Sequence, residues 1–197
     1  QAVRWQLLSR NVLDAVEPPR VQHTQMKALD DAEVKDLLDL TRNKPLYGPV
    51  LIALATGLRR GEILALKWPE VDFEGGQVRV VASMEQTKAG LRLKAPKTAK
   101  SRRSVTLPQF AIDYLRDLKK TQAEERLRVG SVYDNQDFVF AREDGSPVKP
   151  DTLSTNFATM IRRSILPHVR FHDLRHTHAT QLLVQGVNPK VVSERLG

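Results

Sequence analysis

The chain has 197 residues, of which 41% are hydrophobic and 27% charged, a composition typical of a globular domain and not of a disordered segment. Its 31 Lys and Arg exceed its 23 Asp and Glu, and the net charge of +8 favours polyanionic partners. The absence of Cys excludes disulfides and thiolate metal sites, and no apolar run approaches the roughly 18 residues that a membrane span requires, so we expect no membrane partner.

The first 28 residues are predicted to precede the main domain. Residues 1–16 carry apolar side chains at helical spacing and predict a helix, the end of a preceding domain, through Val3, Leu7, Leu8, Val12, Leu13 and Val16. Residues 17–28 contain Pro18-Pro19 among polar residues and predict a linker. The main domain should then span residues 29–197, beginning with a capping box formed by Asp30 and Glu33.

The main domain is predicted to be mostly helical. Helices are expected over residues 46–55, 60–67, 108–127, 151–163 and 172–185, with another from Pro189 onward. Alternating and β-branched patterns predict three strands, at 77–83, 91–95 and 103–107. We expect these strands to form one antiparallel sheet, so the predicted fold class is mainly α with a small three-stranded antiparallel sheet (α+β).

Basic residues are unevenly distributed along the chain. Between Gln86 and Ile112 there are seven basic side chains and no acidic one, and a second basic region follows Arg162. A merely solvated face would mix the two signs, so these regions predict a nucleic-acid surface. The candidate DNA contacts are Lys94, Lys100, Arg102, Arg103, Arg162 and Arg163.

Two motifs carry groups suited to a phosphodiester centre. In Thr56-Gly57-Leu58-Arg59 a helix break precedes an Arg, and Glu62 follows three residues later, where its carboxylate can hold that guanidinium. In His172-Asp173-Leu174-Arg175-His176 the first His and the Arg are three residues apart, on one face of a helix. A guanidinium can neutralise phosphoryl charge, and an imidazole exchanges a proton near neutral pH.

A lysine in the predicted turn before the third strand is a candidate proton donor. Lys97 could protonate a leaving oxygen, because the pKa of a Lys falls when it is partly buried among other cations. Lys94 and Lys100 compete for this role. A metal site is not predicted, although His172 and His176 have a spacing that zinc sites use, because no Glu lies between them and Arg175 would repel a cation.

In order and spacing, these elements resemble the tyrosine recombinase (phage integrase) family. The resemblance covers about residues 29–197, the catalytic domain of the family, and residues 1–16 resemble the last helix of its core-binding domain. It implies a catalytic set of Arg59, Lys97, His172 and Arg175, supported by Glu62, Asp173 and His176. The two arginines would hold the non-bridging oxygens of the scissile phosphate, Lys97 would protonate the 5′ leaving oxygen, and His172 would assist proton transfer.

The implied activity is site-specific DNA recombination or integration through a 3′-phosphotyrosine intermediate, with no metal or nucleotide cofactor. The implied partner is double-stranded DNA, on which the full-length protein would be a tetramer, and the implied setting is the cytoplasm, for a bacterial or phage-encoded mobile-element protein. All three tyrosines, Tyr47, Tyr114 and Tyr133, precede the His172 motif. We therefore expect the nucleophilic tyrosine not to lie in this chain, which should bind DNA without forming the covalent intermediate by itself.

Other functions share part of this pattern. One is a non-catalytic DNA-binding relative with the same fold, and another is an enzyme resembling type IB topoisomerases, which use the same phosphotyrosine chemistry. The compact spacing of the motifs favours the integrase. A metal-dependent nuclease is the least favoured alternative.

Overall fold

A computed structural model of the chain describes residues 2–17, 27–95 and 102–197. Its helices are α1 (Asp31–Thr41), α2 (Tyr47–Thr56), α3 (Arg60–Ala65), α4 (Gln109–Val129), α5 (Pro150–Arg162), α6 (Asp173–Val184) and α7 (Pro189–Leu196). The helices that were predicted from 46–55 onward are confirmed to within two residues at either end. No helix within the described ranges is long and apolar enough to cross a membrane.

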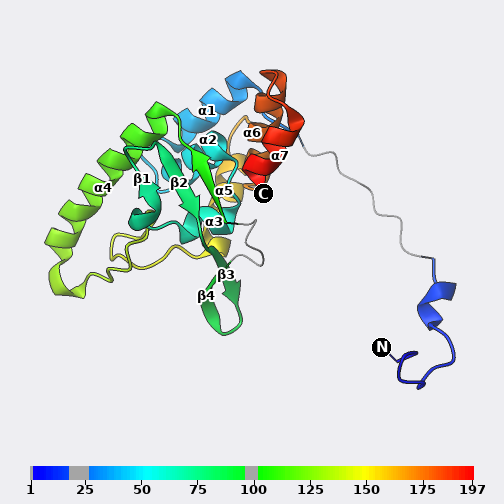
Figure 1. Cartoon of the computed structure of the whole chain (residues 1–197). Coiled ribbons are helices and arrows are strands. Elements are labelled where there is room, and N and C mark those ends of the chain that lie inside the picture. The colour runs from blue at the N-terminus through cyan, green and yellow to red at the C-terminus, as the bar shows by residue number, and fades with distance from the viewer. Residues whose placement is uncertain (1, 18–26, 96–101) are drawn as a thin grey trace.

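Helix α2 forms the centre of the hydrophobic core. Its sequence is apolar on every side, and residues 48–54 and Thr56 are all buried. A helix of this composition is stable only when other elements cover it, and α2 packs against α1, α3, α4 and α6 (Figure 1). The buried position of α2 fixes the point at which it ends, directly before the Gly57–Arg59 segment.

The first turn of α1 is tied to the C-terminal half of the chain. The predicted capping box is present, since Asp30 Oδ1 accepts a hydrogen bond from the Glu33 N–H at 2.8 Å and Glu33 Oε2 accepts one from the Asp30 N–H at 3.0 Å. Just before it, the buried Leu29 N–H donates to Thr177 Oγ1 in α6 at 3.1 Å. The beginning of the main domain therefore holds α6 in place.

The strands form two separate antiparallel units instead of one sheet. Strands β1 (Val71–Asp72), β2 (Gln77–Val80) and β5 (Arg103–Thr106) make a three-stranded sheet in the order β1-β2-β5, while β3 (Ser83–Thr87) and β4 (Gly90–Lys94) form a hairpin that projects from the domain (Figure 1). The predicted three-stranded sheet thus exists, but its predicted membership was wrong. Val78 and Val105 are register partners and both buried, whereas β4 has no buried residue and pairs with β3.

The helix predicted over residues 1–16 is not formed, which corrects that expectation. Only Val12–Ala15 adopt a single 3-10 turn, and the apolar side chains Trp5, Leu7 and Leu13 are exposed. An apolar stripe stabilises a short helix only when it packs against a partner surface. The assignment of residues 1–16 to a preceding domain stays a prediction, and most of the predicted linker, residues 18–26, lies outside the described residues.

Candidate functional site

The break between α2 and α3 presents Arg59. Gly57 ends α2 in the left-handed region, with φ +67°. A Cβ at this position would lie 2.5 Å from Leu196 Cδ2 and 2.7 Å from His178 Cδ2, so both the backbone conformation and the packing require glycine. The chain then becomes extended at Arg59, whose side chain is 47% exposed. The guanidinium of Arg59 is therefore held at the surface by a rigid, buried turn.

Glu62 in α3 joins two arginines. Its Oε1 accepts a hydrogen bond from Arg59 Nη1 at 3.0 Å, as predicted, and its Oε2 accepts one from the Arg59 backbone N–H at 2.9 Å. Arg103 Nη1 and Nη2 also donate to the two oxygens, at 3.1 and 2.9 Å. Burial raises the pKa of Glu62, but the hydrogen bonds from Arg103 and Arg59 outweigh it and bring this pKa below its usual value. Glu62 is therefore ionised at neutral pH.

Arg103 is placed differently from its prediction as a surface DNA contact. Its side chain is 8% exposed and faces Glu62. The sequence shows it as one cation in a basic run, and nothing in the charge pattern alone separates it from Arg102. Strand parity does separate them, because Arg103 lies two residues before the buried Val105 and so on the same face of β5.

Arg175 in α6 converges with Arg59. Arg175 Nη1 donates to the Gly57 carbonyl oxygen at 2.9 Å, and its Nη2 donates to the Gly197 carbonyl oxygen at 3.2 Å. Arg59 Nη2 donates to this same Gly197 oxygen at 2.5 Å. Burial, together with the charges of Arg59 and Arg103, lowers the pKa of Arg175 to about 10, so the guanidinium stays protonated at neutral pH. A single oxygen can therefore be bound by both guanidiniums at once.

His172 and Asp173 begin α6 beside this pair. His172 is exposed, and its pKa is lowered by partial burial and by the charge of Arg175, which favours the neutral imidazole at pH 7. Asp173 is buried, and its carboxylate accepts the Arg170 N–H at 2.8 Å and pairs with Arg170 Nη2 at 2.9 Å. Burial raises the pKa of Asp173, but the bonds from Arg170 bring it below its usual value. Asp173 thus holds the first turn of α6 in the position that presents His172.

A buried histidine, His178, fixes α7 against the site. His178 Nδ1 lies 2.8 Å from the Leu54 carbonyl oxygen, and Arg195 Nε donates to His178 Nε2 at 3.3 Å. Nδ1 therefore carries the proton in the neutral tautomer, and burial lowers the pKa of His178 to about 4. Arg195 Nη2 also donates to the Thr106 carbonyl oxygen at 2.8 Å. These contacts connect α2, α6, α7 and β5.

Among the interactions of the described residues, none joins the remaining predicted residues to Arg59 or Arg175. Lys94 Nζ donates to Glu85 Oε1 at 2.8 Å, across the β3–β4 hairpin. His176 is half-buried in α6, and exposed side chains are found at three candidate DNA contacts, Arg102, Arg162 and Arg163. Lys97 and Lys100 lie outside the described residues, so their positions relative to the arginines are not defined.

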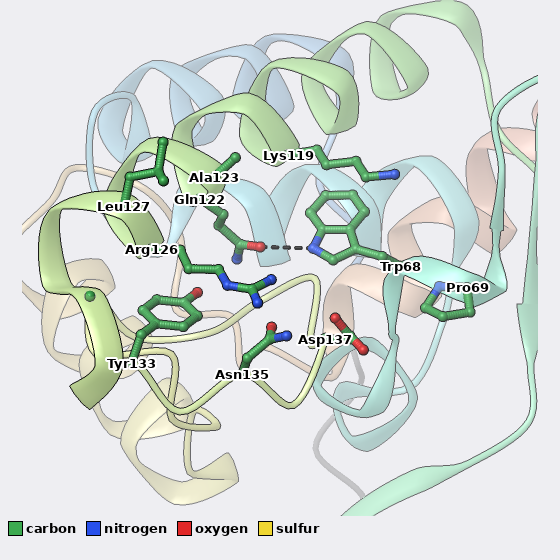
Figure 2. A pocket seen from close by; sticks show the side chains of 11 residues that line it. Trp68, Pro69, Lys119, Gln122, Ala123, Arg126, Leu127, Tyr133, Asn135 and Asp137 are labelled. Atoms are coloured by element: carbon green, nitrogen blue, oxygen red, sulfur yellow. Dashed lines mark hydrogen bonds between the residues drawn. The ribbon is translucent and has the colours of Figure 1, made fainter.

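A pocket of about 880 Å³ lies elsewhere, between the C-terminal half of α4 and the loop that follows it (Figure 2). Figure 2 shows the Trp68 indole over this space, with its Nε1 donating to Gln122 Oε1 at 2.8 Å and Lys119 beside the ring. None of the predicted site residues lines this pocket. Across the described ranges there is also no cluster of His, Asp and Glu side chains that could hold a metal ion. The predicted chemistry is therefore concentrated at the arginine cluster.

The chain matches the phage integrase family over residues 27–197. It is 35% identical over 192 residues to a protein described as tyrosine recombinase XerC-like from Caldanaerobacter subterraneus, covering 91% of this chain and 49% of that protein. It is also 29% identical over 198 residues to the ICEBs1 integrase of Bacillus subtilis, covering 100% and 54%. The chain thus spans about half the length of these relatives.

Solved structures show the same fold. A structure of the Tn1549 transposon integrase in complex with transposon right end DNA has a TM-score of 0.76 at 20% identity, covering 95% of this chain and 62% of that one. The crystal structure of XerA recombinase has a TM-score of 0.68 at 22% identity, covering 91% and 57%. These likenesses confirm the predicted fold class.

Proposed function

The chain belongs to the phage integrase family, and on this premise we propose that it forms the phosphate-binding part of a site-specific DNA recombinase. The observation that carries the proposal is the juxtaposition of two restrained guanidiniums, Arg59 held by Glu62 and Arg175 held by the Gly57 carbonyl oxygen two residues before Arg59. In the proposed complex, these two guanidiniums bind the non-bridging oxygens of the scissile phosphate. The substrate class is double-stranded DNA, and the full-length protein acts as a tetramer on synapsed DNA.

The proposed reaction needs a fixed positive charge more than it needs a metal ion. A tyrosine oxygen attacks phosphorus, the bond from phosphorus to the 5′ oxygen breaks, and negative charge accumulates on the non-bridging oxygens. Two guanidiniums that are already held by protein groups stabilise this charge without reorganising, and the loss of one such donor typically costs about 10²–10³ in rate. Glu62 supplies this restraint for Arg59, and the Gly57 carbonyl supplies it for Arg175.

Proton transfers are assigned to two residues in this proposal. The pKa of His172 is lowered, which keeps the imidazole neutral near pH 7 and able to accept or donate a proton beside Arg175. Lys97 protonates the 5′ oxygen as it leaves. Reversal of the same steps, with a 5′-hydroxyl of another strand as the attacking group, rejoins the DNA without an external energy source.

The tyrosines of this chain are poorly suited to be the nucleophile. Tyr114 packs edge-to-face on Tyr47, with 5.3 Å between the ring centroids, and burial raises its pKa to about 12. Tyr133 lines the pocket beside α4, and burial together with the charge of Glu125 raises its pKa. None of the three contacts Arg59 or Arg175 in the interactions of the described residues, which supports assigning the nucleophile to a tyrosine elsewhere in the full-length protein.

DNA affinity is assigned to the exposed basic side chains. Arg102, Arg162 and Arg163 are exposed, and Lys94 lies on the projecting hairpin. Contacts of this kind bind phosphates regardless of base sequence and position the duplex over the arginine pair. We place this activity in the cytoplasm of a bacterium.

The test compares cleavage with binding in the full-length protein. A nicked DNA substrate that traps the cleaved strand should give a covalent adduct with the wild-type enzyme, and R59A and R175A should each reduce the rate by about 10²-fold or more. DNA affinity should fall by much less, because each variant removes one phosphate contact among several. If both variants lost only affinity, a non-catalytic DNA-binding relative would be favoured. Relaxation of supercoiled DNA without strand exchange would instead favour a type IB topoisomerase.

A further inference from the structure

We propose that Arg103 is a positioning residue of the arginine site, a role that rests on the proposed function. Arg103 lies on β5, forty-one positions after Glu62, and the two side chains form a bidentate ion pair in which they are 8% and 7% exposed. The Arg103 side chain is not part of the exposed surface, and it is not one of the two guanidiniums assigned to the phosphate. Its effect on Arg59 therefore passes through Glu62, which both arginines contact.

The bidentate geometry fixes the plane of the Glu62 carboxylate. Both carboxylate oxygens serve Arg59, Oε1 through the guanidinium and Oε2 through the backbone N–H. A carboxylate that is free to rotate cannot keep both contacts, whereas the planar fork of Arg103 holds both oxygens at once. Arg103 thus determines the direction in which Glu62 holds the Arg59 guanidinium.

Arg103 also connects the sheet to α7. Its Nε donates to the Arg195 carbonyl oxygen at 2.9 Å, so each of its three nitrogens donates to a protein acceptor. Arg59 differs, because its side chain is 47% exposed and only its Nη1 donates to Glu62. We therefore assign the contact with substrate to Arg59, and to Arg103 only the positioning of Arg59.

The charge of Arg103 also affects the ionisation of Glu62. Three guanidiniums surround Glu62: Arg59 directly before α3, Arg103 on β5 and Arg175 on α6. Burial alone would raise the pKa of Glu62, and Arg103 is the main group that opposes this. With Gln at position 103, Glu62 should become protonated at a pH at which the wild-type carboxylate is ionised, and a neutral Glu62 would hold Arg59 more weakly.

The test uses the full-length recombinase and compares R103Q and R103K with the wild type. R79Q is the matched control, since Arg79 is an exposed arginine on the adjacent strand β2. Single-turnover cleavage of the trapping substrate and the Kd for uncleaved DNA are measured from about pH 5 to 8. Only protein that is folded at the assay temperature, as judged by circular dichroism, enters the comparison.

R103Q should cleave about 10²-fold more slowly, as expected for a misplaced catalytic group, while the Kd changes by less than about threefold. The acid limb of its rate should also lie at a higher pH than the limb that protonation of His172 gives the wild type. R103K keeps the charge but loses the fork, so it should be intermediate in rate and keep the pH profile of the wild type. R79Q should match the wild type.

A purely structural role for Arg103 would lower the folded fraction and the reaction amplitude, without changing the rate or the pH profile of the folded enzyme. Wild-type rates and a wild-type pH profile in R103Q would overturn the positioning role. If R103Q does not fold, a wild-type rate in R103K would overturn it instead. If the wild-type enzyme forms no adduct, the proposed function is rejected, and the role of Arg103 is rejected with it. If R175A cleaves slowly but R103Q cleaves at the wild-type rate, only the role of Arg103 is rejected.

Discussion

Glu62 shares its carboxylate between an exposed arginine and a buried one, and these two contacts should differ sharply in their effect on stability. The side chain of Arg59 is 47% exposed, while that of Arg103 is 8% exposed. The two donor–acceptor distances to Glu62 Oε1 are nearly equal, 3.0 and 3.1 Å. A difference between R59Q and R103Q would therefore come from burial and from the further bonds of Arg103, to Glu62 Oε2 and to the Arg195 carbonyl oxygen, and not from the length of the bonds.

The expected losses in the free energy of unfolding follow from this difference in exposure. An ion pair with an exposed partner contributes about 0–1 kcal/mol, because water screens the charges and side-chain entropy opposes the contact. Breaking a buried pair costs about 3–5 kcal/mol, because the remaining charge stays buried. R103Q should therefore lower the free energy of unfolding by about 3 kcal/mol or more, and R59Q by less than about 1 kcal/mol. Against a typical stability of about 5–15 kcal/mol, R103Q would be severely destabilised.

The effect should depend on pH with a defined sign. The pKa of Glu62 is lowered in the folded state, so its stabilisation is present above the unfolded value of about 4.3 and is lost as the pH falls through the folded value. In R103Q only the hydrogen bonds from Arg59 oppose the effect of burial, so the folded pKa of Glu62 should be higher than in the wild type. The stability difference between wild type and R103Q should therefore shrink as the pH falls below about 5.

Urea denaturation of this chain, followed by far-UV circular dichroism, measures both quantities. R79Q serves as the control, because it removes an exposed arginine from the adjacent strand. Equal losses in R59Q and R103Q, or a loss in R103Q that does not change with pH, would refute the reasoning from burial.

Three further outcomes are expected. Gly57→Ala should lower the free energy of unfolding by about 2–4 kcal/mol through φ strain and overpacking, against about 1 kcal/mol for Gly186→Ala, which also has a positive φ at the end of a helix but open space around it; similar losses would contradict the packing argument. Asp173→Asn should cost about 1–3 kcal/mol at pH 7, and this loss should diminish below about pH 4, because the pKa of Asp173 is lowered in the folded state; a pH-independent loss in urea titrations would be inconsistent with that shift. DNA affinity of the chain should fall steeply with salt, by about 10³-fold or more between 50 and 200 mM if about six phosphates are contacted, and a flat dependence in an anisotropy titration would argue against phosphate contacts.

Local patterns were sufficient to predict the helices and the two short motifs. The 3.6-residue periodicity and the capping box locate the helices because both depend on residues that are near in sequence. Arg59 and Glu62, at a spacing of three, were predicted to pair, and they do. The same spacing links Arg170 and Asp173, a pair that the sequence could have indicated by the same rule.

Features that depend on distant partners were missed. The predicted helix over residues 1–16 needs a surface to pack against, and β4 has the alternation of a sheet strand although it pairs only with β3. Arg103 was assigned to the DNA surface because charge patterns do not reveal burial. Its partner Glu62 is forty-one positions away, and only the parity of Arg103 with the buried Val105 indicated an inward-facing side chain.

The central claim is that Arg59 and Arg175 bind a scissile phosphate that is attacked by a tyrosine from outside this chain. The most direct measurement is peptide mapping of the covalent adduct formed on a trapping DNA substrate, by the full-length protein and by residues 1–197 alone. We expect an adduct only with the full-length protein, on a tyrosine other than Tyr47, Tyr114 and Tyr133. An adduct on one of these three, or any adduct with the 197-residue chain alone, would contradict the account.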